Sequence, residues 1–188
     1  PDGVNIGYRH ISLSTCGIVP RSLDLAKESF PITLSISLHA ATDEARSAIM
    51  PVNRKYPIRE LLAACVTYYR TTGRRITFEY TLIHGKNDTE ADARALGTLL
   101  KDAFHGTDAP LHVNLIRVNE VKETGMKQGT TAEANAFAAA LGRMGVSATV
   151  RRRLGSDVAA ACGQLRRASV KEKENTAGDF PEKTETVT

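Results

Sequence analysis

The runs Ile32-Thr-Leu-Ser-Ile-Ser-Leu38 and Ile76-Thr-Phe-Glu-Tyr-Thr-Leu-Ile83 decide the fold of this 188-residue chain. Both are rich in β-branched, aromatic and leucine side chains, which favour extended strands. Three more runs of this kind occur along the chain, at His10–Thr15, Leu111–Val118 and Ser147–Arg151. The sequence therefore predicts five strands.

Helical patterns lie between these strands. Thr42 is predicted to cap a helix that Pro51 stops, and Thr130 with Glu133 forms a capping box. The predicted helical segments are Ser22–Ser29 (the weakest), Thr42–Met50, Ile58–Thr71, Thr89–Phe104 and Thr130–Met144. Alternation of strands and helices predicts an α/β fold with parallel strands and outer helices, either a doubly wound sheet or a barrel. Residues from Ala168 onward lose all periodicity, which predicts a disordered tail over 168–188.

Composition indicates a soluble globular protein, with 41% hydrophobic and 24% charged residues. There is no apolar run long enough to cross a membrane and no signal segment. The three cysteines are widely separated, which argues against a disulfide framework and favours the reducing cytoplasm. No cysteine or histidine pair has metal-site spacing, so no metal ligand is predicted in this chain.

Cys162 lies in the basic segment Arg151–Arg166 (RRRLGSDVAAACGQLR). Nearby arginines favour the nucleophilic thiolate, whereas an isolated cysteine is commonly a small packing residue. Between Arg143 and Glu174 there are eight Lys/Arg and three Asp/Glu, a local charge of +5. This segment is either a solvated face or a surface for nucleic-acid phosphates.

Polar groups lie at the carboxyl ends of three of the predicted strands, at Ser14–Gly17, Ser37–His39 and Arg117–Asn119. Each group alone is commonly structural, because such residues make turns and caps and a single histidine is often buried. Together they would line one pocket, since ligand sites of parallel α/β folds gather at the carboxyl ends of strands. We expect that pocket to take a polar small molecule.

Five motifs carry a family resemblance: STCGIVP (14–20), ISLHA (36–40), PVNRKY (51–56), VNLIRVN (113–119) and ACGQL (161–165). In order and spacing they resemble the radical S-adenosylmethionine adenine methyltransferases of ribosomal RNA. The most similar branch methylates adenine C2 in 23S rRNA and some tRNAs. The resemblance covers about residues 1–167.

The resemblance implies that residues 1–167 form the second half of a partial (β/α)6, TIM-like barrel with a C-terminal strand and loop extension. The first four strands would be the third to sixth of that barrel. It implies that S-adenosylmethionine binds to Ser14, Ser37, Leu38, His39 and Asn119. It also implies that Cys162 is methylated and carries the methylene group to adenine.

In the family mechanism, a second S-adenosylmethionine is cleaved by a reduced [4Fe-4S] cluster to a radical that takes hydrogen from the S-methyl group. A second cysteine helps to release the product. The resemblance further implies 23S rRNA and tRNA as partners, an external electron donor, a cytoplasmic monomer and no membrane.

The chain lacks the family's Cys-x-x-x-Cys-x-x-Cys and Gly-Glu-Pro motifs, and Cys16 and Cys65 cannot replace the cluster ligands. We therefore expect a C-terminal fragment that is inactive alone. Two alternatives remain open: the related adenine-C8 methyltransferases of 23S rRNA, which confer antibiotic resistance, and a basic RNA-binding module without catalysis. Cys65, on an apolar helix face, is expected in the core, and Cys16 beside the pocket.

Overall fold

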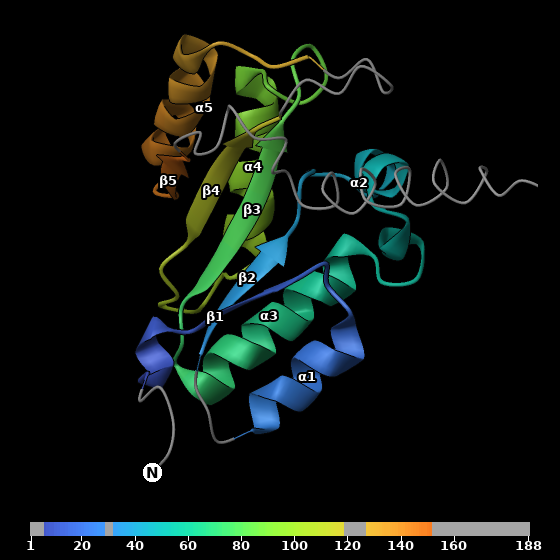
Figure 1. The fold of residues 1–188 in the computed structure, drawn as a ribbon, viewed down its shortest axis with the longest axis vertical. Helices are drawn as coiled ribbons and strands as arrows, with labels where there is room; N and C mark the ends of the chain where they lie inside the picture. Colours follow the sequence, from blue (N-terminus) through green and yellow to red (C-terminus); the bar gives the residue numbers. More distant parts are fainter. Residues whose placement is uncertain (1–5, 29–31, 119–126, 152–188) are drawn as a thin grey trace, which may run out of the picture. The chain divides into compact units, whose positions relative to one another are not determined.

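The described part of the chain contains a parallel sheet of five strands. The computed structural model describes residues 6–28, 32–118 and 127–151. The strands are adjacent in chain order (Figure 1) and comprise β1 (Ser12–Thr15), β2 (Thr33–Ser37), β3 (Ile76–Leu82), β4 (His112–Arg117) and β5 (Ser147–Val150). The predicted tail, Cys162 and Asn119 lie outside the described residues. The predicted parallel α/β fold is confirmed.

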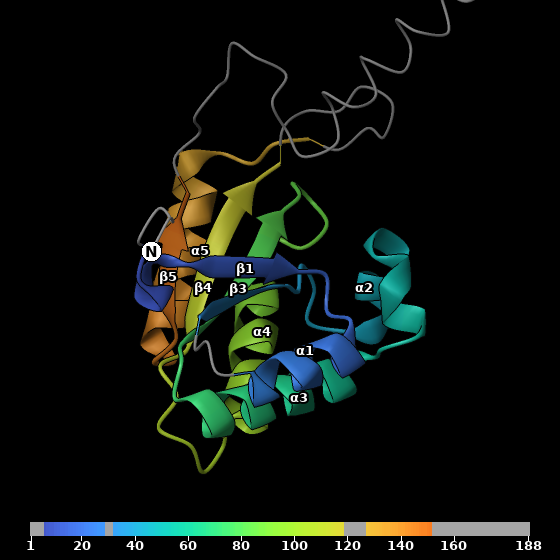
Figure 2. The same cartoon turned by 60° about the horizontal axis from the view of Figure 1, so that its bottom comes forward.

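Helices connect the strands and cover one face of the sheet, apart from α2 (Asp43–Ile49), which lies beyond the carboxyl ends of β1 and β2 (Figures 1 and 2). They are α1 (Val19–Lys27), α2 (Asp43–Ile49), α3 (Ile58–Thr72), α4 (Glu90–Ala103) and α5 (Thr131–Arg143), with short 3-10 helices at Tyr8–His10 and Pro51–Arg54. Parallel strands in sequential order, joined by right-handed crossovers, place their helices on one side. No helix in the described ranges is both long and apolar enough to span a membrane.

The core lies between the sheet and these helices. Leu34, Ile36 and Phe78 point from the strands into it and are fully buried, and Leu61 and Leu96 meet them from α3 and α4. Removal of this apolar surface from water is the main force that holds the two layers together. Cys65 also belongs to this core, as predicted, and burial raises the pKa of its thiol to about 12.

The helix boundaries follow local hydrogen bonding. The Thr42 hydroxyl accepts a hydrogen bond from Ala45 N, and Thr130 and Glu133 form the predicted capping box. Gly73 ends α3 in the left-handed conformation, with φ 65°. Two elements, β1 and α1, differ from the prediction by more than one residue at an end. His10 lies in a 3-10 turn because its N–H donates to the Gly7 carbonyl, and α1 begins at Val19 because Pro20 suits a first helical turn.

Substitutions at two glycines on helices should have opposite effects on stability. Gly73→Ala should destabilise the chain by about 1 kcal/mol, because alanine is strained at a positive φ. Gly142→Ala in α5 should stabilise it by about 0.5 kcal/mol, because a Cβ there meets no other atom and alanine favours the helix. Urea unfolding of both variants measures the difference. If the urea midpoints of the two variants move in the same direction, the predicted opposite effects of Gly73→Ala and Gly142→Ala are wrong.

Candidate functional site

Three of the predicted site residues lie at one edge of the sheet. Ser14 is the penultimate residue of β1, Ser37 is the last residue of β2, and His39 follows two residues later. Because β1 and β2 are parallel neighbours, their carboxyl ends meet at the same edge. Ser14 is exposed, and Ser37 and His39 are partly exposed. Their roles as ligands stay predictions.

Leu38 lies between these residues, but its side chain points into the core and is fully buried. Its N–H donates to the Glu79 carbonyl at 3.1 Å, and its own carbonyl accepts from Arg46 Nε at 3.1 Å. Both backbone groups are therefore already paired. These bonds hold Leu38 and its two neighbours in place, and its role as a ligand residue stays a prediction.

His39 has an unusual backbone and a fixed ring. Its φ is 60°, the only positive φ of a non-glycine residue in the described ranges. Its Nδ1 accepts a hydrogen bond from Thr81 N at 3.2 Å, so in the neutral ring the hydrogen is on Nε2. Burial, and secondarily the charge of Arg46, lowers the pKa of His39 from 6.5 to about 4. His39 is therefore neutral near pH 7, with Nε2–H as a donor.

A buried arginine joins the ends of β1 and β2. Arg46, in α2, is fully buried. Its Nη2 donates to the carbonyls of Cys16 at 2.8 Å and Ser37 at 3.1 Å, and its Nε donates to the Leu38 carbonyl. One guanidinium thus binds three carbonyl oxygens at the strand ends, and two of them belong to the predicted ligand residues Ser37 and Leu38. The exposed Cys16 takes part through its backbone.

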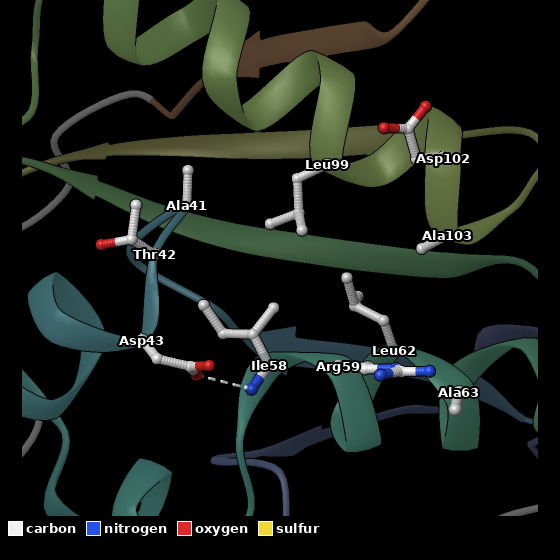
Figure 3. A pocket seen from close by; sticks show the side chains of 10 residues that line it. All are labelled: Ala41, Thr42, Asp43, Ile58, Arg59, Leu62, Ala63, Leu99, Asp102 and Ala103. Carbon is white, nitrogen blue, oxygen red and sulfur yellow. Dashed lines mark hydrogen bonds between the residues drawn. The ribbon is translucent and has the colours of Figure 1, made fainter.

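Asn53 completes the surroundings of this arginine. Its Oδ1 accepts from Arg46 Nη1 at 2.9 Å, and its Nδ2 donates to Asp43 Oδ1 at 2.9 Å. The same Asp43 oxygen accepts from the Ile58 N–H at 2.8 Å, the dashed line in Figure 3. A chain of hydrogen bonds therefore runs from the strand ends to the start of α3. Burial lowers the pKa of Arg46, and Asp43 is among the charges that partly offset this effect.

The face of the sheet opposite the helices is polar. Side chains at matched positions of neighbouring strands share a face. The register produces two rows on it: Ser14, Ser35, Thr77, His112 and Ser147, and then Ser37, Glu79, Asn114 and Thr149. Hydrogen bonds within this face include Asn114 Nδ2 to Glu79 Oε1 at 2.9 Å. Such a surface suits a polar ligand and would be a poor packing surface for an apolar one.

A second group of polar residues connects the loop after β3 to His39 and to the end of β3 itself. Asn87 Nδ2 donates to the His39 carbonyl at 3.3 Å and to the Thr81 carbonyl at 2.9 Å. Nearby, ligand atoms of His84, Asp88 and Glu133 lie within 4.8 Å of one another, close enough to hold a metal ion. They are already bonded: His84 Nδ1 is 3.2 Å from Asp88 Oδ2, and Glu133 serves in the capping box of α5. We assign this group to loop positioning.

A cavity of about 520 Å³ opens between α3 and α4, away from the polar face (Figure 3). Ile58, Leu62 and Leu99 give it an apolar lining, and its charged side chains include Arg59 and Asp102. Its lining contains none of the residues predicted to bind a ligand. The polar strand edge therefore remains the candidate site.

Arg46, Asn53 and Glu79 are parts of this site that were not predicted from the sequence. Asn53 lies within one of the family motifs, PVNRKY, but the motif alone assigns no role to it. The alternation of polar with apolar residues in Thr33–Ser37 and Thr77–Thr81 is a signal for the polar face. A single arginine in Asp43–Ile49 gives no such signal, because charged helix residues are commonly solvated.

The arginine network should contribute strongly to stability. Arg46→Met should reduce the free energy of unfolding by about 3 kcal/mol or more, because it leaves buried carbonyls without donors. Arg59→Met is the matched control, since Arg59 is exposed on α3, and it should change stability by only about 0.5 kcal/mol. Urea unfolding measures both. Equal effects would show that the network contributes little.

His39 should make stability depend on pH. With a pKa of about 4 when folded and 6.5 when unfolded, the unfolded chain binds more protons between these values. Stability should therefore fall as pH drops from about 6.5 to 4, by at most roughly 3 kcal/mol from this residue. His39→Asn, which tolerates a positive φ, should show a shallower fall than the parent chain. Thermal unfolding across this pH range tests this, and parallel curves would contradict it.

Comparisons with known proteins agree with this architecture. Proteins described as "Probable dual-specificity RNA methyltransferase RlmN" match most of the chain. The protein from Clostridium perfringens is 53% identical over 171 residues (91% of this chain), and the protein from Pelotomaculum thermopropionicum is 49% identical over 180 residues (95%). This chain covers 48% of each, so it spans about half the length of these curated relatives. No protein-family model matches it.

Solved structures give the same result. A radical SAM methyltransferase from Sphaerobacter thermophilus superposes with a TM-score of 0.78 at 46% identity, over 86% of this chain and 46% of that one. A domain of pyruvate-formate lyase-activating enzyme from Bacteroides vulgatus matches 75% of this chain and 80% of that domain, with a TM-score of 0.54 at 15% identity. The second similarity supports the fold alone.

Proposed function

We propose that this chain, which belongs to the radical S-adenosylmethionine RNA methyltransferase family, provides half of an RNA adenine methyltransferase. The proposed reaction is methylation of adenine C2 in 23S rRNA and some tRNAs. The observation that carries the proposal is the 53% identity to a relative described as a dual-specificity RNA methyltransferase. The strand edge with Ser14, Ser37 and His39 supports it, because it gathers hydrogen-bonding groups where such folds bind ligands.

The residues present fit S-adenosylmethionine. The polar face provides hydroxyl groups at Ser14 and Ser37, and His39 provides an Nε2–H donor. Glu79 Oε2 is a buried oxygen without a hydrogen-bond partner in the described ranges, which is consistent with a ligand on this face. When bound, S-adenosylmethionine supplies an electrophilic methyl group. Arg46 would act indirectly, by fixing the backbone that presents Ser37 and His39.

We assign the thiol of Cys162 as the methyl acceptor. Bound S-adenosylmethionine would supply the methyl group. The Cys162 thiolate would form a sulfur–carbon bond to the methyl carbon as the sulfonium bond breaks, with that bond's electron pair left on the departing thioether. The arginines that flank Cys162 in sequence favour the thiolate. Asn119 is assigned as a further contact to the same ligand. Both residues lie outside the described ranges.

The described residues do not fit an iron–sulfur cluster. Cys16 and Cys65 are their only cysteines, and Cys65 is fully buried in the core. We therefore propose that residues outside the described ranges supply the ligands of the cluster that the family uses. The proposal also includes a cytoplasmic monomer. It includes an external electron donor because the reductive chemistry of the family requires one.

An adenine-C8 methyltransferase remains the second candidate, because the same motifs serve both regiochemistries. Mass spectrometry of nucleosides released from methylated 23S rRNA, with 2-methyladenosine and 8-methyladenosine as chromatographic standards, separates the two products. We expect the 2-methyl product. The 8-methyl product alone would overturn the assignment to C2.

Cys162 provides the sharpest test of this proposal. In a chimera, this chain replaces the segment that it matches in the Clostridium perfringens relative. After incubation with S-adenosylmethionine, the peptide that contains Cys162 should carry one additional methyl group by mass spectrometry. Cys162→Ser should abolish transfer to 23S rRNA, because a hydroxyl is a far weaker nucleophile than a thiolate.

Cys65→Ala serves as the control, since the Cys65 thiol is buried in the core and should not carry the methyl group. This variant should retain methyl transfer. If Cys162→Ser methylates RNA at the rate of the unchanged chimera, Cys162 is only a packing residue. A chimera that binds RNA without methylating it would instead favour the non-catalytic RNA-binding module.

A further inference from the structure

Glu79 has one carboxylate oxygen that the protein leaves without a hydrogen bond. The residue lies in the middle of β3, and its side chain is only 10% exposed. Oε1 accepts from Asn114 Nδ2 at 2.9 Å. Oε2 is buried and has no hydrogen-bond donor among the described residues. A buried carboxylate oxygen without a donor destabilises the folded chain by more than an ordinary hydrogen bond stabilises it. A ligand or a water molecule that donates to this oxygen would remove that cost.

Neighbouring side chains hold this carboxylate in one orientation. Asn114 Oδ1 lies 3.2 Å from His112 Nε2, and Thr149 Oγ1 lies 3.3 Å from the same nitrogen. These contacts fix the amide that binds Glu79 Oε1. Oε2 is therefore a preorganised acceptor, and its position is set before any ligand arrives.

Glu79 is also directly connected to the candidate site. It pairs in register with Ser37, so both side chains are on the polar face. Its backbone carbonyl accepts from Leu38 N and His39 N, each at 3.1 Å. A ligand held by Ser37 and His39 would thus lie beside the free oxygen.

The charge around Glu79 selects the kind of donor. Arg151 Nη1 is 3.9 Å from Oε2, close enough to balance the negative charge but too far for a hydrogen bond. A cationic ammonium group would meet the positive charge of Arg151, whereas a hydroxyl would not. Acidic residues bind ribose hydroxyls in this way in other parallel α/β folds. The donor that fits best is therefore an uncharged ribose hydroxyl.

We propose that Glu79 is a binding residue that accepts a hydrogen bond from a ribose hydroxyl of S-adenosylmethionine through Oε2. This inference rests on the proposed function and adds a residue to its cofactor site. RNA also carries ribose hydroxyls. The register with Ser37 favours the cofactor, and binding measured without RNA distinguishes the two sources.

The test is a binding cycle on the chimera of this chain with the Clostridium perfringens relative. Calorimetry measures the affinities of S-adenosylmethionine and its 2′-deoxy and 3′-deoxy analogues for the unchanged chimera and for Glu79→Gln. Glu79→Gln should weaken binding of S-adenosylmethionine by about 10- to 100-fold, the usual effect of losing a hydrogen bond to a charged group. For one of the two deoxy analogues, the same substitution should have almost no effect.

Glu60→Gln is the matched control, since Glu60 is exposed on α3, and it should leave all three affinities unchanged. If Glu79→Gln does not fold, Glu79→Asp, which withdraws the carboxylate by one methylene, should give the same pattern. Equal weakening of all three ligands would show a purely structural role and overturn the proposal. An effect on RNA binding alone would overturn it too.

Failure of the proposed function has a different signature. If the unchanged chimera binds none of the three ligands, the cofactor site itself is wrong, and the inference about Glu79 fails with it. If the unchanged chimera binds S-adenosylmethionine and Glu79→Gln binds it equally well, only the inference about Glu79 is overturned.

Discussion

The hydrogen bonds of the buried Arg46 hold the carboxyl ends of β1 and β2 together, and the candidate site depends on them. One side chain from α2 binds carbonyl oxygens at the carboxyl ends of two different strands, at Cys16 after β1 and at Ser37, the last residue of β2. Moving a guanidinium out of water is costly, so the arrangement is stable only while these acceptors and Asn53 remain in place. The same contacts determine where the strand ends lie relative to each other. Stability and the geometry of the candidate site are therefore coupled through one residue.

The two faces of the sheet have different roles. Apolar side chains such as Leu34 and Phe78 pack under the helices and supply most of the driving force for folding. Polar side chains on the other face, including Ser37 and Glu79, add little to that core and are costly to bury. Their arrangement is explained if a polar ligand binds against them. The similarity to a radical SAM methyltransferase over 86% of this chain is consistent with that role.

Much of this fold could be predicted from the sequence, because its local signals agree with its tertiary structure. The strand runs around Leu34 and Phe78 are strongly β-forming, and the capping residues Thr42 and Thr130 mark helix starts by direct hydrogen bonds. For His10 the prediction of a strand is wrong, although its neighbours favour extension. The His10 N–H donates to the Gly7 carbonyl and forms a turn there, and the composition of this segment does not predict that hydrogen bond.

The candidate site was only partly predictable. Ser14, Ser37 and His39 lie at or just after the carboxyl ends of strands, so topology alone brings them to one edge. Arg46 and Glu79 could not be identified in this way. They matter because they are buried, and their burial results from packing between residues far apart in the sequence. The left-handed backbone of His39 is equally hidden in the sequence, since it depends on hydrogen bonds to β3. For Asn119 and Cys162, the family resemblance remains the basis of the assignment.

A crystal structure of the chimera with S-adenosylmethionine would test the proposed site most directly. We expect ligand density at the carboxyl edge of β1 and β2, in contact with Ser14 and Ser37 and within hydrogen-bond distance of Glu79 Oε2. Arg46 should keep its bonds to the Cys16 and Ser37 carbonyls in that complex. Ligand density in the cavity between α3 and α4, with the polar face of the sheet covered only by water, would show that the site is wrong.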